Sequence, residues 1–179
     1  MEDAALEPRR IWWARPRKLC ALERPGGGGR NHRAARRAAE IAWVRGRGVR
    51  MVVSVMRSRH NLSQYEAAGL DWHHLPVRWP QDEPDALEEL LPLLRTVLAA
   101  TGAVALHGDS HTDFVAAVCA AHLHEVRGAD LAEALDQASS AGLTVTPRAC
   151  ALLGVELDGF EPQPVVVAET LANVLSQPG

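Results

Sequence analysis

Short apolar runs alternate along this chain with longer segments in which apolar residues recur at helical spacing. The short runs are β-branched or aromatic and end at proline, glycine or charged residues, a pattern typical of strands. They predict strands at residues 11–14, 18–21, 49–55, 72–77 and 103–107. The segments with helical spacing predict helices at residues 31–46, 63–68, 84–100, 113–126, 130–139 and 146–153.

The first predicted helix has a clear division between an apolar and a basic side. Asn31 is suited to cap its N-terminus, because its side chain can accept a hydrogen bond from the first turn. Helical spacing places the predicted buried side at Ala35, Ala38, Ile41 and Ala42. The same spacing places Arg33, Arg36 and Arg37 on the solvent side.

Strands that alternate with helices predict an α/β fold of three layers, with helices on both faces of a mainly parallel sheet of about four or five strands. We expect a loose segment at residues 1–10, one domain at residues 11–160 and a C-terminal extension at residues 161–179, marked by Pro162 and Pro164. Residues 165–175 fit either a helix or a strand. In such sheets, binding sites lie beyond the carboxyl ends of the strands.

Composition indicates a protein of the cytoplasm without membrane contact. Of the 179 residues, 47% are apolar, but no apolar run approaches the ~18 residues that suggest a membrane span. The chain begins Met-Glu-Asp and has no hydrophobic signal core. Its three cysteines, Cys20, Cys119 and Cys150, form neither a zinc pattern nor a disulfide framework, which fits a reducing compartment.

Charge is unevenly distributed, although the net charge is only -3. Residues 1–59 hold 15 Lys and Arg against 5 Asp and Glu, whereas residues 60–179 hold 4 against 17. Such asymmetry fits either an acidic partner or attraction between the two halves of one fold. Because aromatic residues are not interleaved with the basic ones, we expect no nucleic-acid partner. A basic interaction face built on Arg30, Arg33, Arg36 and Arg37 stays an alternative.

The segment from Ala103 to Leu123 carries the most informative pattern. An apolar run ends at His107, a polar loop reaches Phe114, and an alanine-rich helix follows. A strand, a tight loop and a helix together can hold a phosphate group at the helix N-terminus. The segment resembles the signature of the dual-specificity branch of the protein tyrosine phosphatases, which reads His-Cys, five residues, Arg. His107 matches the histidine, whereas Gly108 stands at the cysteine position and Phe114 at the arginine position.

The resemblance extends over about residues 10–155 and implies a phosphatase-like fold. Residues 11–26 are similar to the aromatic strand, proline turn and second strand that open many small bacterial and archaeal members. Residues 51–55 resemble their Val-Val-Ser-Leu strand. Residues 65–77 resemble the helix and strand that precede the loop with the family's general acid. Residues 128–135 resemble the helix that follows the signature.

The resemblance also implies that the catalytic chemistry is lost. Active members attack phosphorus with a cysteine thiolate and hold the phosphoryl group with arginine, and neither Gly108 nor Phe114 can do so. His111 replaces the central family glycine. Asp109 and Asp113 oppose a dianion, with no Lys or Arg between residues 96 and 126 to offset them. We therefore expect weak or no phosphate binding.

The family resemblance assigns further roles near this loop. The loop equivalent to the family signature consists of His107, Gly108, Asp109, Ser110, His111, Thr112, Asp113 and Phe114. His107 would orient it, as the corresponding histidine does in the family. Asp82, in the loop after the fourth predicted strand, is the nearest match to the family's general acid, although its register is poor. The resulting hypothesis is a catalytically degenerate phosphatase-fold protein that binds a protein partner or has a regulatory role, without a cofactor.

Two other families offer interpretations of the same loop. Gly108 to Asp113 resembles the first block of the Gly-Asp-Ser esterases, with Ser110 as nucleophile, but no Asp-x-x-His pair follows it. Asp109-Ser-His111 also resembles the opening of the binuclear metallophosphatases, whose later ligand blocks are absent. Alternating His107, Asp109, His111 and Asp113 would share one side of an extended segment, whereas a curled loop would separate them. We expect no metal, and a hydrolase that uses Ser110, His111 or a metal stays the alternative.

Overall fold

A computed structural model describes residues 5–28, 33–78, 80–109 and 111–156 of this chain. The strands in this range are β1 (Ile11–Arg15), β2 (Leu19–Glu23), β3 (Val49–Ser54), β4 (Asp71–His74) and β5 (Ala103–Gly108). The helices are α1 (Ala34–Gly46), α2 (Leu62–Ala67), α3 (Glu83–Thr101), α4 (Asp113–Arg127), α5 (Leu131–Ser140) and α6 (Pro147–Leu153). The sequence predictions for Arg30, Asn31, Ser110 and residues 161–179 fall outside the described residues.

The five strands form one sheet in the order β1-β2-β5-β3-β4. Strands β2, β5, β3 and β4 run parallel, and only β1 is antiparallel to its neighbour. The reason is the length of the connections. A tight turn at residues 15–18 joins β1 to β2, whereas a parallel neighbour needs a crossover long enough to hold a helix. The predicted α/β fold with a mainly parallel sheet is confirmed.

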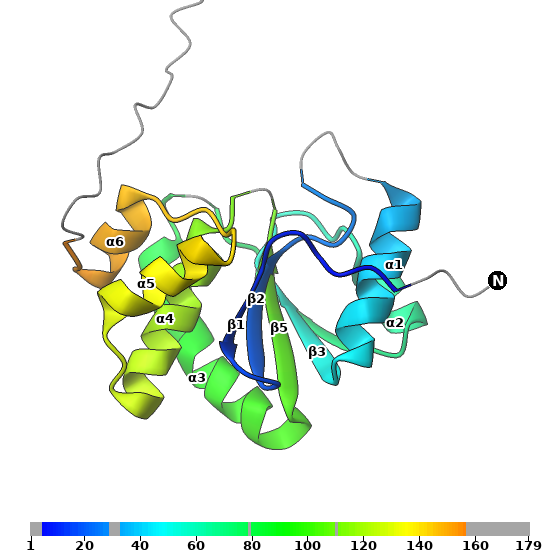
Figure 1. Cartoon of the computed structure of the whole chain (residues 1–179), viewed down its shortest axis with the longest axis horizontal. Coiled ribbons are helices and arrows are strands. Elements are labelled where there is room, and N and C mark those ends of the chain that lie inside the picture. The colour runs from blue at the N-terminus through cyan, green and yellow to red at the C-terminus, as the bar shows by residue number, and fades with distance from the viewer. Residues whose placement is uncertain (1–4, 29–32, 79, 110, 157–179) are drawn as a thin grey trace, which may run out of the picture.

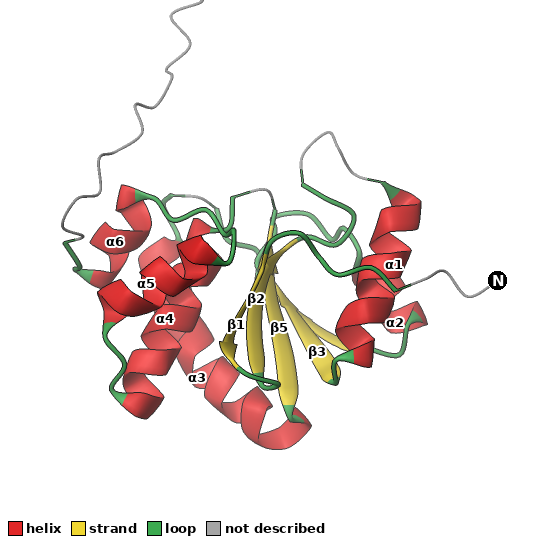
Figure 2. Cartoon of the chain, viewed as in Figure 1, coloured by secondary structure: helices red, strands yellow, loops and turns green. Residues whose placement is uncertain are grey.

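Helices cover both faces of the sheet, as Figures 1 and 2 show. On one face, α1 and α2 pack over a core that includes Leu22, Ile41 and Tyr65. On the other face lie α3, α4, α5 and α6 (Figure 1). All residues of α4 from Asp113 to Leu123 are buried, because α4 lies between the sheet and the outer helices. Its many alanines allow this close approach. Within the described ranges, no helix has both the length and the apolar composition needed to cross a bilayer.

Strand β4 is shorter than the sequence predicted. The apolar run at residues 72–77 predicted a strand to Val77, but β4 ends at His74. Leu75 and Val77 still donate backbone hydrogen bonds toward β3, to Ser54 and Val55 at 3.0 and 3.1 Å. These two donors are two residues apart but their acceptors are consecutive residues, so the regular ladder of β4 ends at His74.

Helix α1 buries Ile41, as predicted, but the rest of its buried side differs from the prediction. Its buried residues are Ala39, Glu40, Ile41 and Val44, whereas Ala35 and Ala38 are exposed. Glu40 is only 1% exposed. Its carboxylate accepts hydrogen bonds from Gly26 N and from Arg36 Nε, each at 2.7 Å. These bonds make burial of a charged residue possible, and apolar spacing alone could not reveal them.

The Glu40 contacts correct the expectation that Arg36 lies on a solvated face. We expect Arg36→Gln to lower the free energy of unfolding by about 2 kcal/mol, because it leaves a buried carboxylate without its cation. Arg33→Gln and Arg37→Gln serve as matched controls and should each change it by about 0.5 kcal/mol or less. Urea unfolding of the three variants measures the difference. Equal effects at all three positions would contradict a special role for the Arg36–Glu40 pair.

Candidate functional site

The loop after β5 lies at the carboxyl edge of the sheet, beside the segments that follow β2 and β3. Backbone hydrogen bonds connect these segments, from Val55 N to His107 O and from Arg24 N to Gly108 O, each at 3.0 Å. Because β2, β5 and β3 are parallel neighbours, their carboxyl ends meet at one edge (Figure 1). This is the edge at which parallel α/β sheets hold their ligands.

An open pocket of about 340 Å³ lies beside this loop. Much of its lining is apolar, from Val55, Met56, Val77 and Phe114. Arg57, Asp109 and His111 add polar groups to the same pocket. The structure therefore brings four residues of the signature-like loop to it, namely Gly108, Asp109, His111 and Phe114. Ser110 lies outside the described residues.

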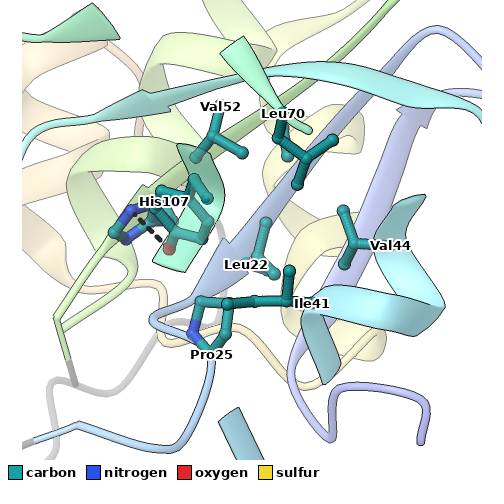
Figure 3. A pocket seen from close by; sticks show the side chains of 9 residues that line it. Leu22, Pro25, Ile41, Val44, Val52, Leu70 and His107 are labelled. Carbon is teal, nitrogen blue, oxygen red and sulfur yellow. Dashed lines mark hydrogen bonds between the residues drawn. The ribbon is translucent and has the colours of Figure 1, made fainter. Parts of the chain in front are cut away.

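His107 points away from this pocket, toward α2. Its side chain is fully buried and lines a small apolar cavity of about 10 Å³ between the sheet, α1 and α2 (Figure 3). The ring nitrogen Nδ1 lies 3.1 Å from the carbonyl oxygen of Gly108, which can only accept, so Nδ1 carries the hydrogen. Nε2 therefore accepts from the Tyr65 hydroxyl at 3.1 Å.

Burial lowers the pKa of His107 to about 4, so its imidazole is neutral near pH 7. Burial also raises the pKa of Tyr65, which keeps the phenol protonated as the donor. A neutral histidine with both ring nitrogens bonded holds the end of β5 in place. This geometry fits the orienting role that the family resemblance implied for His107.

The two residues at the signature positions differ in their surroundings. Gly108 has little space on its side-chain side, where a Cβ atom would lie 3.2 Å from the carbonyl oxygen of His111 and 3.7 Å from Val115 Cγ1. Phe114 is 5% exposed and belongs to the core that α3, α4 and the sheet share. An apolar ring thus occupies the position where the family has its phosphate-binding guanidinium.

Thr112 and Asp113 face the α5–α6 connection rather than the pocket. Thr112 Oγ1 accepts a hydrogen bond from Thr144 N at 2.7 Å. Asp113 is 2% exposed, and its Oδ2 accepts from the Thr146 hydroxyl at 2.8 Å. The sequence interpretation set both loop carboxylates against a bound dianion, but only Asp109 lines the pocket.

Arg24 is the residue near the loop that sequence reasoning missed. Its side chain is 4% exposed, and its guanidinium lies 3.5 Å from the Asp109 carboxylate and donates to Gly27 O at 3.2 Å. The absence of Lys and Arg from residues 96–126 therefore does not leave Asp109 without a nearby cation. The only sequence signal was the position of Arg24 directly after a strand. Local sequence patterns do not predict the strand order that places β2 beside β5.

Asp82 lies at the N-terminus of α3 and does not line the pocket. Its carboxylate accepts hydrogen bonds from Arg78 N at 3.0 Å and Arg78 Nε at 3.1 Å. The hydrogen bond from the Arg78 side chain lowers the pKa of Asp82, which keeps it ionised. A general acid needs the opposite environment, one that keeps its proton near neutral pH.

The remaining candidate side chains are dispersed. His107, Asp109 and Asp113 point in different directions, so the alternating pattern does not build a metal site. No group of three or more His, Cys, Asp or Glu in the described part of the chain is arranged to hold a metal ion. Cys20, Cys119 and Cys150 are buried and unpaired with one another. Burial raises the pKa of all three thiols, which makes them poor nucleophiles.

The order of the strands, the helices on both faces and the loop after β5 define the fold of the dual-specificity and protein tyrosine phosphatases. Human DUSP28 has this fold, with a TM-score of 0.62 and 22% identity over 84% of this chain and 94% of its own. TpbA of P. aeruginosa has a TM-score of 0.61 and 20% identity over 80% of this chain and 83% of its own. PTPMT1, solved in complex with PI(5)P, has a TM-score of 0.58 and 15% identity over 80% and 92%.

These similarities confirm the phosphatase-like fold that the sequence resemblance implied. Identities of 15–22% establish the architecture. The activity depends on which residues this chain has at its site. No family model and no curated protein matches the sequence.

Proposed function

We propose that this chain is a catalytically degenerate phosphatase-fold protein that uses the pocket beside Gly108 for binding rather than for phosphoryl transfer. The observation that carries the proposal is Phe114. Its ring is buried in the core and forms part of the pocket wall, at the position where active members carry the signature arginine.

The rest of the loop supports the same conclusion. Gly108 offers no nucleophile, and the three thiols of the chain are buried elsewhere. Asp109 places a carboxylate at the pocket, and Arg24 already pairs with it at 3.5 Å, so this cation is engaged by Asp109 rather than held ready for a phosphate group. The largely apolar lining is suited to an apolar group of a protein partner, because burying apolar surface stabilises such a contact.

We expect no hydrolysis of p-nitrophenyl phosphate or of phosphotyrosine peptides above background. Losing the nucleophile and the anion clamp removes several orders of magnitude of rate, against the ~1–1000 per second of ordinary enzymes. Phosphate titrated in a calorimeter should show no saturable binding in the micromolar range.

The variants Ser110→Ala and His111→Ala distinguish the proposal from the alternative hydrolase. Activity of about 1 per second that persists through purification and disappears in either variant would contradict the proposal and establish altered chemistry in this loop. The variant Cys119→Ser is the matched control, because Cys119 is buried in α4 and should affect neither activity nor phosphate binding.

A further inference from the structure

A second open groove, of about 530 Å³, lies at the end of the sheet opposite the Gly108 loop. It is bounded by the turn that precedes β2 and by the end of α1, which precedes β3. Because β2 and β3 are parallel, these two segments meet at the amino ends of the strands. The groove is therefore distinct from the pocket at the carboxyl edge and has no part in the function proposed for it.

Two tryptophans supply the aromatic surface of this groove. Trp13 comes from β1 and Trp43 from α1, and both line the groove. Each is half-buried and packs against the core between the sheet, α1 and α2. This packing fixes the two indoles in place, so their side chains lose little conformational entropy when a flat ligand binds.

Arginines lie directly beside these indoles. The Arg47 guanidinium lies over the Trp43 ring, 4.6 Å from its centroid. Arg17 lines the same groove from the turn between β1 and β2, where its backbone takes the left-handed conformation with φ of 59°. Both arginines are exposed, as are Lys18 and Arg45 in the adjoining segments. Among the described residues that line the groove, Glu7 is the only acidic one.

We propose that this groove binds single-stranded nucleic acid through base stacking on the indoles, with the exposed Arg47 side chain moving off the Trp43 ring to contact phosphate together with Arg17. Basic grooves with aromatic platforms are how proteins hold single strands without reading their sequence. In the sequence, Trp13 precedes Arg17 and Lys18, and Trp43 precedes Arg45 and Arg47. The fold brings these two separate segments to one groove, which the sequence alone did not indicate. An acidic peptide would use the arginines and leave the indoles unused.

The test is fluorescence anisotropy of a labelled oligothymidylate of about twelve nucleotides, with the full chain, at several salt concentrations. The double variant Arg17→Ala/Arg47→Ala removes two phosphate contacts, so the slope of log K against log salt should become shallower by about 1.4. The variant Trp43→Leu should weaken binding about tenfold, the loss expected for one stacking platform. Thermal unfolding confirms that each variant is folded.

The matched control is Arg9→Ala/Arg127→Ala, which removes the same two charges outside the groove. Both residues are exposed; Arg9 lies beside Gly142, and Arg127 lies in the last turn of α4. This control should retain most of the affinity and the salt slope. An equal loss in both double variants would overturn the proposal and indicate diffuse charge attraction. So would the absence of binding at low salt, or binding of polyglutamate in place of the oligonucleotide.

Discussion

Acidification from about pH 6.5 to pH 4 should destabilise this protein by about 3 kcal/mol through His107 alone. Burial lowers the pKa of His107 to about 4 in the folded chain, whereas an unfolded histidine has an ordinary pKa near 6.5. Between these values the unfolded state binds the proton and the folded state does not. Stability that is complete above pH 6.5 is therefore lost as the pH falls toward 4.

Urea unfolding at a series of pH values, on the wild type and on His107→Gln, measures this effect. Other groups also titrate in this range, so the informative quantity is the difference between the two proteins. That difference should shrink by about 3 kcal/mol between pH 7 and pH 4. His111→Gln is the matched control, because His111 is exposed on the same loop. Parallel pH profiles for the wild type and His107→Gln would show that the folded state protonates His107 as readily as the unfolded state.

The elements of the fold could be predicted because local patterns carry them. The β-branched run at residues 49–55 becomes β3, and the apolar run ending at His107 becomes β5. Asp130 caps α5 by accepting a hydrogen bond from Glu133 N, as Asp caps commonly do. The phosphatase-like arrangement followed from the order of these elements together with the motif around Gly108.

The contacts of the site could not be predicted in the same way, because they join residues distant in the sequence. Arg24 reaches Asp109 only because β2 lies beside β5. Asp113 bonds the Thr146 hydroxyl and does not line the pocket. Glu40 is buried because it bonds the backbone of Gly26. Each of these polar contacts overrides what residue type alone suggests about charge and exposure.

Restoring both signature residues, with Gly108→Cys and Phe114→Arg, should give a less stable protein without phosphatase activity. The change at Phe114 replaces a ring that is 5% exposed with a guanidinium facing the core, which should cost about 3 kcal/mol. The change at Gly108 is milder. Its Cβ would lie 3.2 Å from the carbonyl oxygen of His111, so the loop must shift slightly, at a cost on the order of 1 kcal/mol.

Single variants separate these two effects. Gly108→Ala tests the space at the nucleophile position, and Phe114→Leu removes the ring without adding charge, at about 1 kcal/mol. Urea unfolding and hydrolysis of p-nitrophenyl phosphate are measured on each.

An arginine at position 114 that escaped the core would reach the pocket that Asp109 lines. There the Asp109 carboxylate would form an ion pair with the introduced guanidinium, which would then not be available to a phosphate group. Adding Asp109→Ala and His111→Gly should therefore raise activity above that of the double variant, whereas Asp113, which bonds Thr146, should be left unchanged. Activity near ~1 per second in the double variant itself would show that Asp109 does not oppose a bound phosphate.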